Sequence, residues 1–159
     1  MNRTIQIAPV RKSVVVDATP AEAFDTFTAG IDRWWPKSHG IGAAPLVESV
    51  IEPRVGGRWY TKHADGSEAV VGHVSVWQPG ERFVVSWEIS ADWKPDARIA
   101  LASEVEVRFT AEAAARTRVD LEHRNLERLG DSAEKLREAV DSSGGWGALL
   151  ALFAEEAAN

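Results

Sequence analysis

Apolar residues with helical spacing extend over the C-terminal part of the chain, from Asp131 to Ala158. Residues three or four positions apart lie on one face of a helix, and here that face holds Ala133, Leu136, Val140, Trp146, Leu149, Leu150 and Phe153. Asp131 and Glu134 match a capping box, so we expect one long helix of about 27 residues, roughly 40 Å, that starts there. Gly144 and Gly145 interrupt the pattern and predict a bend in this helix.

The middle of the chain alternates between apolar and polar residues, which indicates β-strands. Turn residues divide it into six predicted strands near 46–52, 57–63, 68–78, 82–90, 100–111 and 116–125. Short connections make neighbouring strands antiparallel. One face of the last three strands is apolar and holds Phe83, Val85, Trp87, Ile89, Val105, Val107, Phe109, Val119, Leu121 and His123. The opposite face is charged, and we expect weak, solvated ion pairs between its Glu104, Glu106 and Glu122 and nearby arginines.

The N-terminal part predicts one strand, best formed at Ser13 to Asp17, and two short helices. Thr19, Pro20 and Glu22 form a helix-start pattern with a hydroxyl cap and proline at the first position. The buried face of this region is expected to hold Ala23, Phe24, Phe27 and Ile31, and a second helical turn ends before Pro36. The whole pattern predicts an α+β fold, in which the apolar face of a seven-stranded antiparallel sheet is covered by the C-terminal helix.

Length and composition restrict the classes of function that this chain can have. A chain of 159 residues with 45% hydrophobic residues predicts one domain over residues 1–159, with its core at about 13–157. The formal net charge of -6 and the pI near 5.2 argue against nucleic acid as a partner. Without cysteine there is no thiolate chemistry and no disulfide. No signal peptide and no run of roughly 18 apolar residues is found, so we expect a cytoplasmic protein without a membrane span.

The order of these elements and several short motifs resemble the helix-grip fold of the START-like or SRPBCC superfamily. The chain is similar to its bacterial branch homologous to the activator of heat-shock-protein ATPase. The motifs lie at Asp17 to Phe24, Trp34 to Pro36, Pro53 to Trp59, Gly72 to Val74, Pro79 to Trp87, and Gly145-Trp146. The resemblance implies an apolar cavity between the sheet and the C-terminal helix. Members of the superfamily bind lipids, hormones or polyketides there, and some are cyclases or hydroxylase components.

Tryptophan is abundant, and strand phase and helix position direct several indoles towards the space between the two layers. The candidate ligand-binding residues are Trp34, Trp35, Trp59, Trp87, His123 and Trp146. The alternative is that these tryptophans only fill the core. His123 is either a polar contact for a ligand or a buried structural histidine. The other histidines are too scattered for a metal site, and the pattern predicts neither a metal nor a cofactor.

Three functional hypotheses remain open. The first is a noncatalytic binder of a small hydrophobic molecule, either a lipid or an aromatic metabolite. The second is a cyclase-like or hydrolase-like enzyme that uses a cavity histidine as general base. The third is a co-chaperone-like module that binds another protein, and a homodimer is compatible with each of the three. Binding without turnover is favoured, because no acid and base pair can be placed on the inward face and no catalytic residue is assigned.

Overall fold

The computed structural model describes residues 7–39, 44–90, 93–94, 96, 98 and 102–158. The strands are β1 Val10–Val16, β2 Leu46–Ile51, β3 Arg58–His63, β4 Glu68–Gln78, β5 Arg82–Trp87, β6 Ser103–Ala113 and β7 Arg116–Arg124. The helices are α1 Pro20–Phe27, α2 Ile31–Trp34, α3 Ala133–Val140 and α4 Trp146–Ala157, with short 3-10 turns η1 Lys37–His39 and η3 Leu126–Ser132. Residues 100 and 101, expected to begin a strand, lie outside the described residues.

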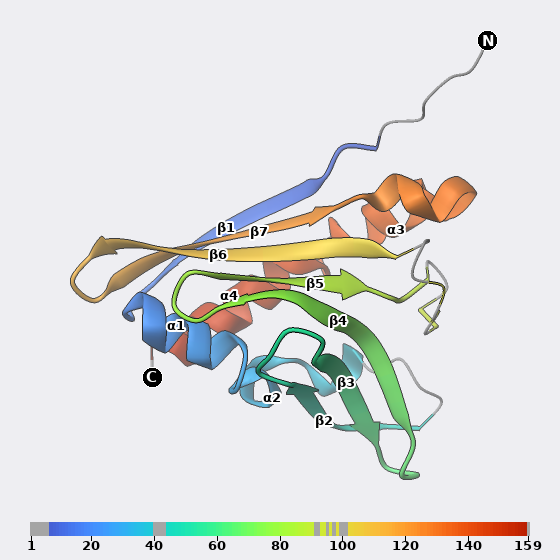
Figure 1. Cartoon of the computed structure of the whole chain (residues 1–159), viewed down its shortest axis with the longest axis horizontal. Helices are drawn as coiled ribbons and strands as arrows, with labels where there is room; N and C mark the ends of the chain where they lie inside the picture. The colour runs from blue at the N-terminus through green and yellow to red at the C-terminus, as the bar shows by residue number, and fades with distance from the viewer. Residues whose placement is uncertain are drawn as a thin grey trace.

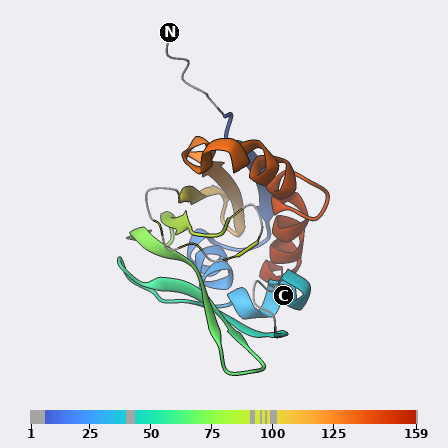
Figure 2. The ribbon, with the colours of Figure 1, turned by 90° about the vertical axis from the view of Figure 1, so that its right-hand side faces the viewer.

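The seven strands form one antiparallel sheet in the order β1-β7-β6-β5-β4-β3-β2. Long β4 bends, so that β3 and β2 turn away from the other strands and the sheet curls around the helices (Figure 1). A shift of register beside the bend, between Trp59 and Tyr60, accompanies this curvature. Seen from the side, α4 faces the hollow of the sheet (Figure 2). The expected α+β helix-grip fold is therefore confirmed.

Local signals explain the N-terminal elements. The Thr19 hydroxyl accepts the Glu22 amide at 3.2 Å, and the Glu22 carboxylate accepts the Thr19 amide at 3.0 Å, so the predicted capping box is present. Phe24 and Phe27 of α1 are buried against the sheet and α4, and Phe27 lies 5.0 Å from Phe153 between ring centroids. Strand β1 begins at Val10 and not at Ser13, directly after Pro9, which lacks the amide that a ladder needs.

The prediction of one long C-terminal helix from Asp131 is wrong. The segment consists of η3, α3 and α4, and Asp131 lies inside η3 while Ser132, without a side-chain cap, precedes α3. Gly130, at φ 63°, separates the first part of η3 from α3. The predicted bend at the glycines is a full interruption over residues 141–145, called here the α3–α4 break. Apolar residues on both sides of this break are buried, so α3 and α4 each turn an apolar face to the core.

The two glycines of the α3–α4 break differ in what surrounds them. A Cβ atom on Gly145 would lie 2.0 Å from the Val140 carbonyl oxygen, whereas one on Gly144 would meet nothing within 4 Å. Gly145→Ala is therefore expected to lower the free energy of unfolding by about 1–3 kcal/mol, as overpacking does. Gly144→Ala is expected to stay within about 0.5 kcal/mol of the natural chain. Urea unfolding of both variants checks this, and equal effects would contradict it.

The predicted faces of the strands agree with the structure. Two carboxylates on the outer face are nevertheless buried. The expected inward residues are buried, but Glu106 on the opposite face is only 5% exposed. Its carboxylate lies 2.8 Å from Arg82, 3.0 Å from Arg108 and 2.6 Å from Arg124. Burial alone would raise the pKa of Glu106, but hydrogen bonds from Arg124 and Arg82 hold it below its usual value. The expectation of weak, solvated pairs is therefore wrong at Glu106. Glu88 is also buried, where it pairs with His73 at 2.6 Å.

Candidate ligand-binding site

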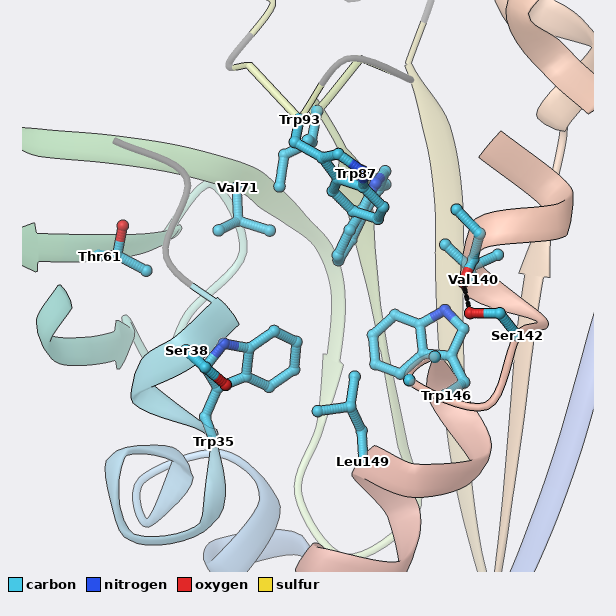
Figure 3. A pocket seen from close by; sticks show the side chains of 14 residues that line it. Trp35, Ser38, Thr61, Val71, Trp87, Trp93, Val140, Ser142, Trp146 and Leu149 are labelled. Carbon is cyan, nitrogen blue, oxygen red and sulfur yellow. Dashed lines mark hydrogen bonds between the residues drawn. The ribbon is translucent and has the colours of Figure 1, made fainter. Parts of the chain in front are cut away.

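A cavity of about 540 Å³ lies between the inner face of the sheet and the α3–α4 break. On the sheet side its wall consists of Thr61 from β3, Val71 from β4, Trp87 at the end of β5, and Ile89, which follows β5. The other side is formed by Trp35 and Ser38 after α2, and by residues of α3, the α3–α4 break and α4, including Val140, Trp146 and Leu149. Figure 3 shows Trp35 and Trp146 on opposite sides of this space, with Leu149 below them. The wall is mainly apolar, and its hydroxyl groups are those of Ser38, Thr61 and Ser142.

The α3–α4 break positions Trp146. The Ser142 hydroxyl donates to the Ala139 carbonyl at 2.6 Å, and the Gly145 amide donates to the Ser142 carbonyl at 2.9 Å. These bonds turn the chain after α3, so that α4 begins at Trp146 with its indole at the cavity wall (Figure 3). A continuous helix would carry residue 146 farther along its axis, at 1.5 Å per residue. The interruption therefore brings an indole to the cavity.

Four tryptophans form a closed series of ring contacts, called here the four-tryptophan cluster. The ring centroids of Trp35 and Trp59 lie 5.1 Å apart, those of Trp59 and Trp87 5.8 Å, those of Trp87 and Trp146 5.5 Å, and those of Trp146 and Trp35 6.0 Å. All four contacts are edge to face, the arrangement that the ring quadrupoles favour. Three members of the cluster, Trp35, Trp87 and Trp146, give the cavity an aromatic wall, and Trp59 supports it from behind.

The structure divides the six predicted site residues into two groups. Trp35, Trp87 and Trp146 line the cavity. The other three, Trp34, Trp59 and His123, lie behind this wall or in the core. Trp34 donates its indole N–H to the Thr26 carbonyl at 3.0 Å, and Trp59 packs between Trp35 and Trp87.

His123 is fully buried behind Trp146, and both of its ring nitrogens have partners. The indole Nε1 of Trp146 donates to His123 Nδ1 at 3.0 Å, and His123 Nε2 lies 2.7 Å from the Ser103 hydroxyl. Burial lowers the pKa of His123 to about 3. The ring is therefore neutral at physiological pH, and neither nitrogen is free to take a proton from a molecule in the cavity.

Sequence reasoning missed two features of the site. Trp93 lines the cavity, is 45% exposed and has a left-handed backbone at φ 60°. It lies in a connection after β5 where no periodic pattern exists. The second feature is Thr61, whose hydroxyl lies 2.8 Å from Nε2 of buried His63, while His63 Nδ1 lies 3.0 Å from the Ala44 carbonyl. Alternation along β3 from Trp59 would have placed both Thr61 and His63 on the inward face.

The geometry can hold a flat, mostly apolar molecule and offers it a few hydroxyl groups. A volume of about 540 Å³ falls in the range of about 300–1,000 Å³ typical of small-molecule sites. In the described part of the chain no helix is long and apolar enough to cross a membrane. The lining residues Ser38, Trp93, Ser142 and Gly144 are exposed to solvent.

Solved structures with the same fold include two with appreciable sequence identity. The anthrahydroquino-gamma-pyrone synthase Txn09, in a complex with SUM, is 39% identical, with a TM-score of 0.67 over 95% of this chain and 97% of that chain. The self-sacrificing resistance protein CalC from Micromonospora echinospora is 29% identical, with a TM-score of 0.65 over 94% of this chain and 93% of that chain.

A third relative, the Aha1 dimer from Colwellia psychrerythraea, shares the fold at 13% identity and a TM-score of 0.62, covering 94% of this chain and 95% of that chain. No match was found among curated proteins. The family model described as Activator of Hsp90 ATPase homolog 1-like protein matches residues 17–158. This match confirms the resemblance drawn from the motifs, and the chain belongs to the family of Activator of Hsp90 ATPase homolog 1-like proteins.

Proposed function

We propose that this protein binds a small planar aromatic molecule in the cavity and releases it unchanged. The observation that carries the proposal is the aromatic wall of a cavity of about 540 Å³, to which Trp35, Trp87 and Trp146 each present an indole. Indoles held by ring contacts lose little freedom when a ligand arrives, so the site is organised before binding. The few hydroxyl groups in the wall suit a ligand with polar substituents at its rim.

The expected energetics favour binding. An aromatic group that buries about 200 Å² of surface gains about 5 kcal/mol at about 25 cal/mol per Å². The buried indole N–H groups of Trp59 and Trp87 have no hydrogen-bond partner among the described residues. Such unpaired donors destabilise a core. Trp87 lines the cavity, and an unpaired donor kept there supports a role beyond filling the interior.

One relative supports an aromatic ligand rather than a lipid. The relative at 39% identity is a synthase of an anthrahydroquino-gamma-pyrone, and its name describes fused aromatic rings. The match covers 95% of this chain and 97% of that chain. The relative at 29% identity is a resistance protein and not a synthase, so the fold in these relatives is compatible with a role other than synthesis.

The test is a titration with dihydroxyanthraquinone, read through quenching of tryptophan emission. We expect a saturable signal that disappears when the protein is unfolded in urea. Leu149→Trp places a larger side chain in the cavity wall and is expected to weaken binding at least tenfold, equivalent to about 1.4 kcal/mol. Leu152→Trp, the same change on the exposed side of α4, is the matched control and should bind like the natural chain.

Other outcomes separate the remaining hypotheses. Probe recovered after incubation with an altered mass would favour the enzyme hypothesis, in which the Thr61 hydroxyl at the cavity wall, 2.8 Å from His63 Nε2, is the hydroxyl with a histidine beside it. Absence of saturable binding to the folded natural chain would leave the protein-interaction module. The homodimer stays a prediction that light scattering tests, since the relative solved as a dimer is only 13% identical.

A further inference from the structure

The indole of Trp146 is held by a chain of buried hydrogen bonds that reaches across the sheet. Trp146 begins α4, His123 lies on β7 and Ser103 begins β6. Trp146 Nε1 lies 3.0 Å from His123 Nδ1, and His123 Nε2 lies 2.7 Å from Ser103 Oγ. All three residues are buried, so no solvent competes with these bonds.

Hydrogen-bond chemistry fixes the direction of this chain. An indole nitrogen can only donate, so His123 Nδ1 must be the acceptor and carries no proton. The neutral ring then carries its proton on Nε2 and donates it to the Ser103 hydroxyl oxygen. Either removing Ser103 Oγ or moving the proton to Nδ1 would break this arrangement. The Trp146 indole therefore sets the tautomer of His123, and the Ser103 hydroxyl stabilises that tautomer by accepting the proton on Nε2.

Trp146 depends on this restraint because of its place in the chain. It is the first residue of α4, and the preceding residues 141–145 are not helical. A tryptophan inside a helix packs against the turn before it, but no such turn precedes Trp146. Its indole rests instead on Trp35 and Trp87, which are themselves cavity residues.

We propose that His123, supported by Ser103, is a positioning residue that fixes the Trp146 indole in the cavity wall and thereby sets which planar aromatic molecules the cavity accepts. The ligand named in this inference rests on the proposed function, whereas the hydrogen bonds of Trp146, His123 and Ser103 do not depend on it. His123 does not line the cavity, so it acts through Trp146 and not by contact with the ligand. Without the acceptor the indole is free to rotate into the cavity space, and the shape of the wall is lost.

A matched pair of variants tests the acceptor alone. Asparagine and leucine both branch at Cγ, so His123→Asn and His123→Leu place their terminal groups at equivalent positions behind the indole, with leucine the bulkier of the two. Asparagine keeps an amide oxygen close to the position of Nδ1, where it can accept from Trp146, whereas leucine offers no acceptor. We expect His123→Leu to weaken binding of dihydroxyanthraquinone about fivefold or more, the effect of losing one hydrogen bond of about 1 kcal/mol. His123→Asn is expected to keep the affinity within about twofold.

The second readout needs no ligand. In a nitrogen-proton NMR correlation spectrum, the indole N–H of Trp146 should be shifted downfield and protected from exchange in the natural chain and in His123→Asn. Both the downfield shift and the protection from exchange should be lost in His123→Leu. If His123 only filled space, the bulkier leucine should preserve the indole signal and the affinity at least as well as asparagine does, which is the opposite of the order expected here.

The outcomes distinguish this inference from the proposed function. If the natural chain does not bind the probe, the proposed function fails, while the indole signal still tests the hydrogen-bond chain. An unchanged indole signal together with unchanged affinity in His123→Leu would overturn the inference. Should His123→Leu fail to fold, Ser103→Ala takes its place, since it removes the partner of Nε2 and is expected to reduce the exchange protection of the Trp146 N–H. Full protection in that variant would overturn the inference equally.

Discussion

Replacing Gly72 with alanine is expected to lower the free energy of unfolding by about 3 kcal/mol or more, at the upper end of overpacking effects. A Cβ atom at Gly72 would lie 1.6 Å from the Ser86 carbonyl oxygen and 2.7 Å from its carbon. These atoms belong to the backbone of β5, so no side-chain rotation relieves the clash. The strands β4 and β5 would have to separate where the sheet bends.

The surroundings show why this close approach exists. The Glu88 amide donates to the Val71 carbonyl at 2.6 Å, and the His73 amide donates to the Ser86 hydroxyl at 2.9 Å. β4 and β5 are therefore drawn together on both sides of Gly72. Val71 also lines the cavity, so a separation here would deform the site as well as the sheet.

Gly147→Ala is the matched control for Gly72→Ala. Gly147 lies in α4, and a Cβ atom there would meet nothing within 4 Å. Alanine in a helix is favoured over glycine by about 0.5–1 kcal/mol, so this variant should be slightly more stable than the natural chain. Thermal and urea unfolding compare the two. A Gly72→Ala variant as stable as the natural chain would show that the strands do not approach this closely.

Local patterns predicted the fold well because the residues on one face of a strand or helix recur at a fixed spacing along the chain. Alternation placed Val105, Val107 and Phe109 on the inner face without knowledge of their partners, and all three are buried. The C-terminal helix was mispredicted for the same reason. The apolar spacing within Ala133 to Val140 and within Trp146 to Phe153 reports which side of each helix faces the core, and it carries no information on whether the chain between them is helical.

The candidate site was only partly predictable, since alternation identifies inward residues but not empty space. Trp59 and Trp87 point inward alike, yet only Trp87 lines the cavity, because Trp59 is covered by its neighbours. The partners of His123 are 20 and 23 residues away along the chain. Likewise, Glu106 was expected to be solvated, and only the pairing of β5, β6 and β7 brings arginines over it.

His123 also predicts a marked loss of stability in mild acid. Burial lowers its pKa from an ordinary 6.5 to about 3 in the folded protein. Between these two values the unfolded chain binds a proton that the folded chain refuses, so acid favours unfolding. The contribution of neutral His123 to the free energy of unfolding is fully present above pH 6.5 and is lost as the pH falls towards 3. Each pKa unit corresponds to about 1.4 kcal/mol, which gives a total of about 4–5 kcal/mol.

Carboxylates with a lowered pKa, such as Glu106, change the stability only at lower pH. Burial alone would raise the pKa of Glu106, but hydrogen bonds from Arg124 and Arg82 hold it below 4.5, so its contribution is lost only as the pH falls below that value. The interval between pH 6.5 and 4.5 therefore isolates the histidine, where the loss due to His123 should reach about 2–3 kcal/mol.

Urea unfolding of the natural chain and His123→Asn at a series of pH values measures this loss. Asparagine does not titrate, so the variant should start less stable at neutral pH and lose less stability down to pH 4.5. The difference between the two curves isolates His123 from the other histidines, which both proteins share. Parallel curves would mean that His123 takes up its proton in the folded state at an ordinary pH. Such a proton would add a donor to the buried ring, and the bonds to Trp146 and Ser103 described above would have to rearrange.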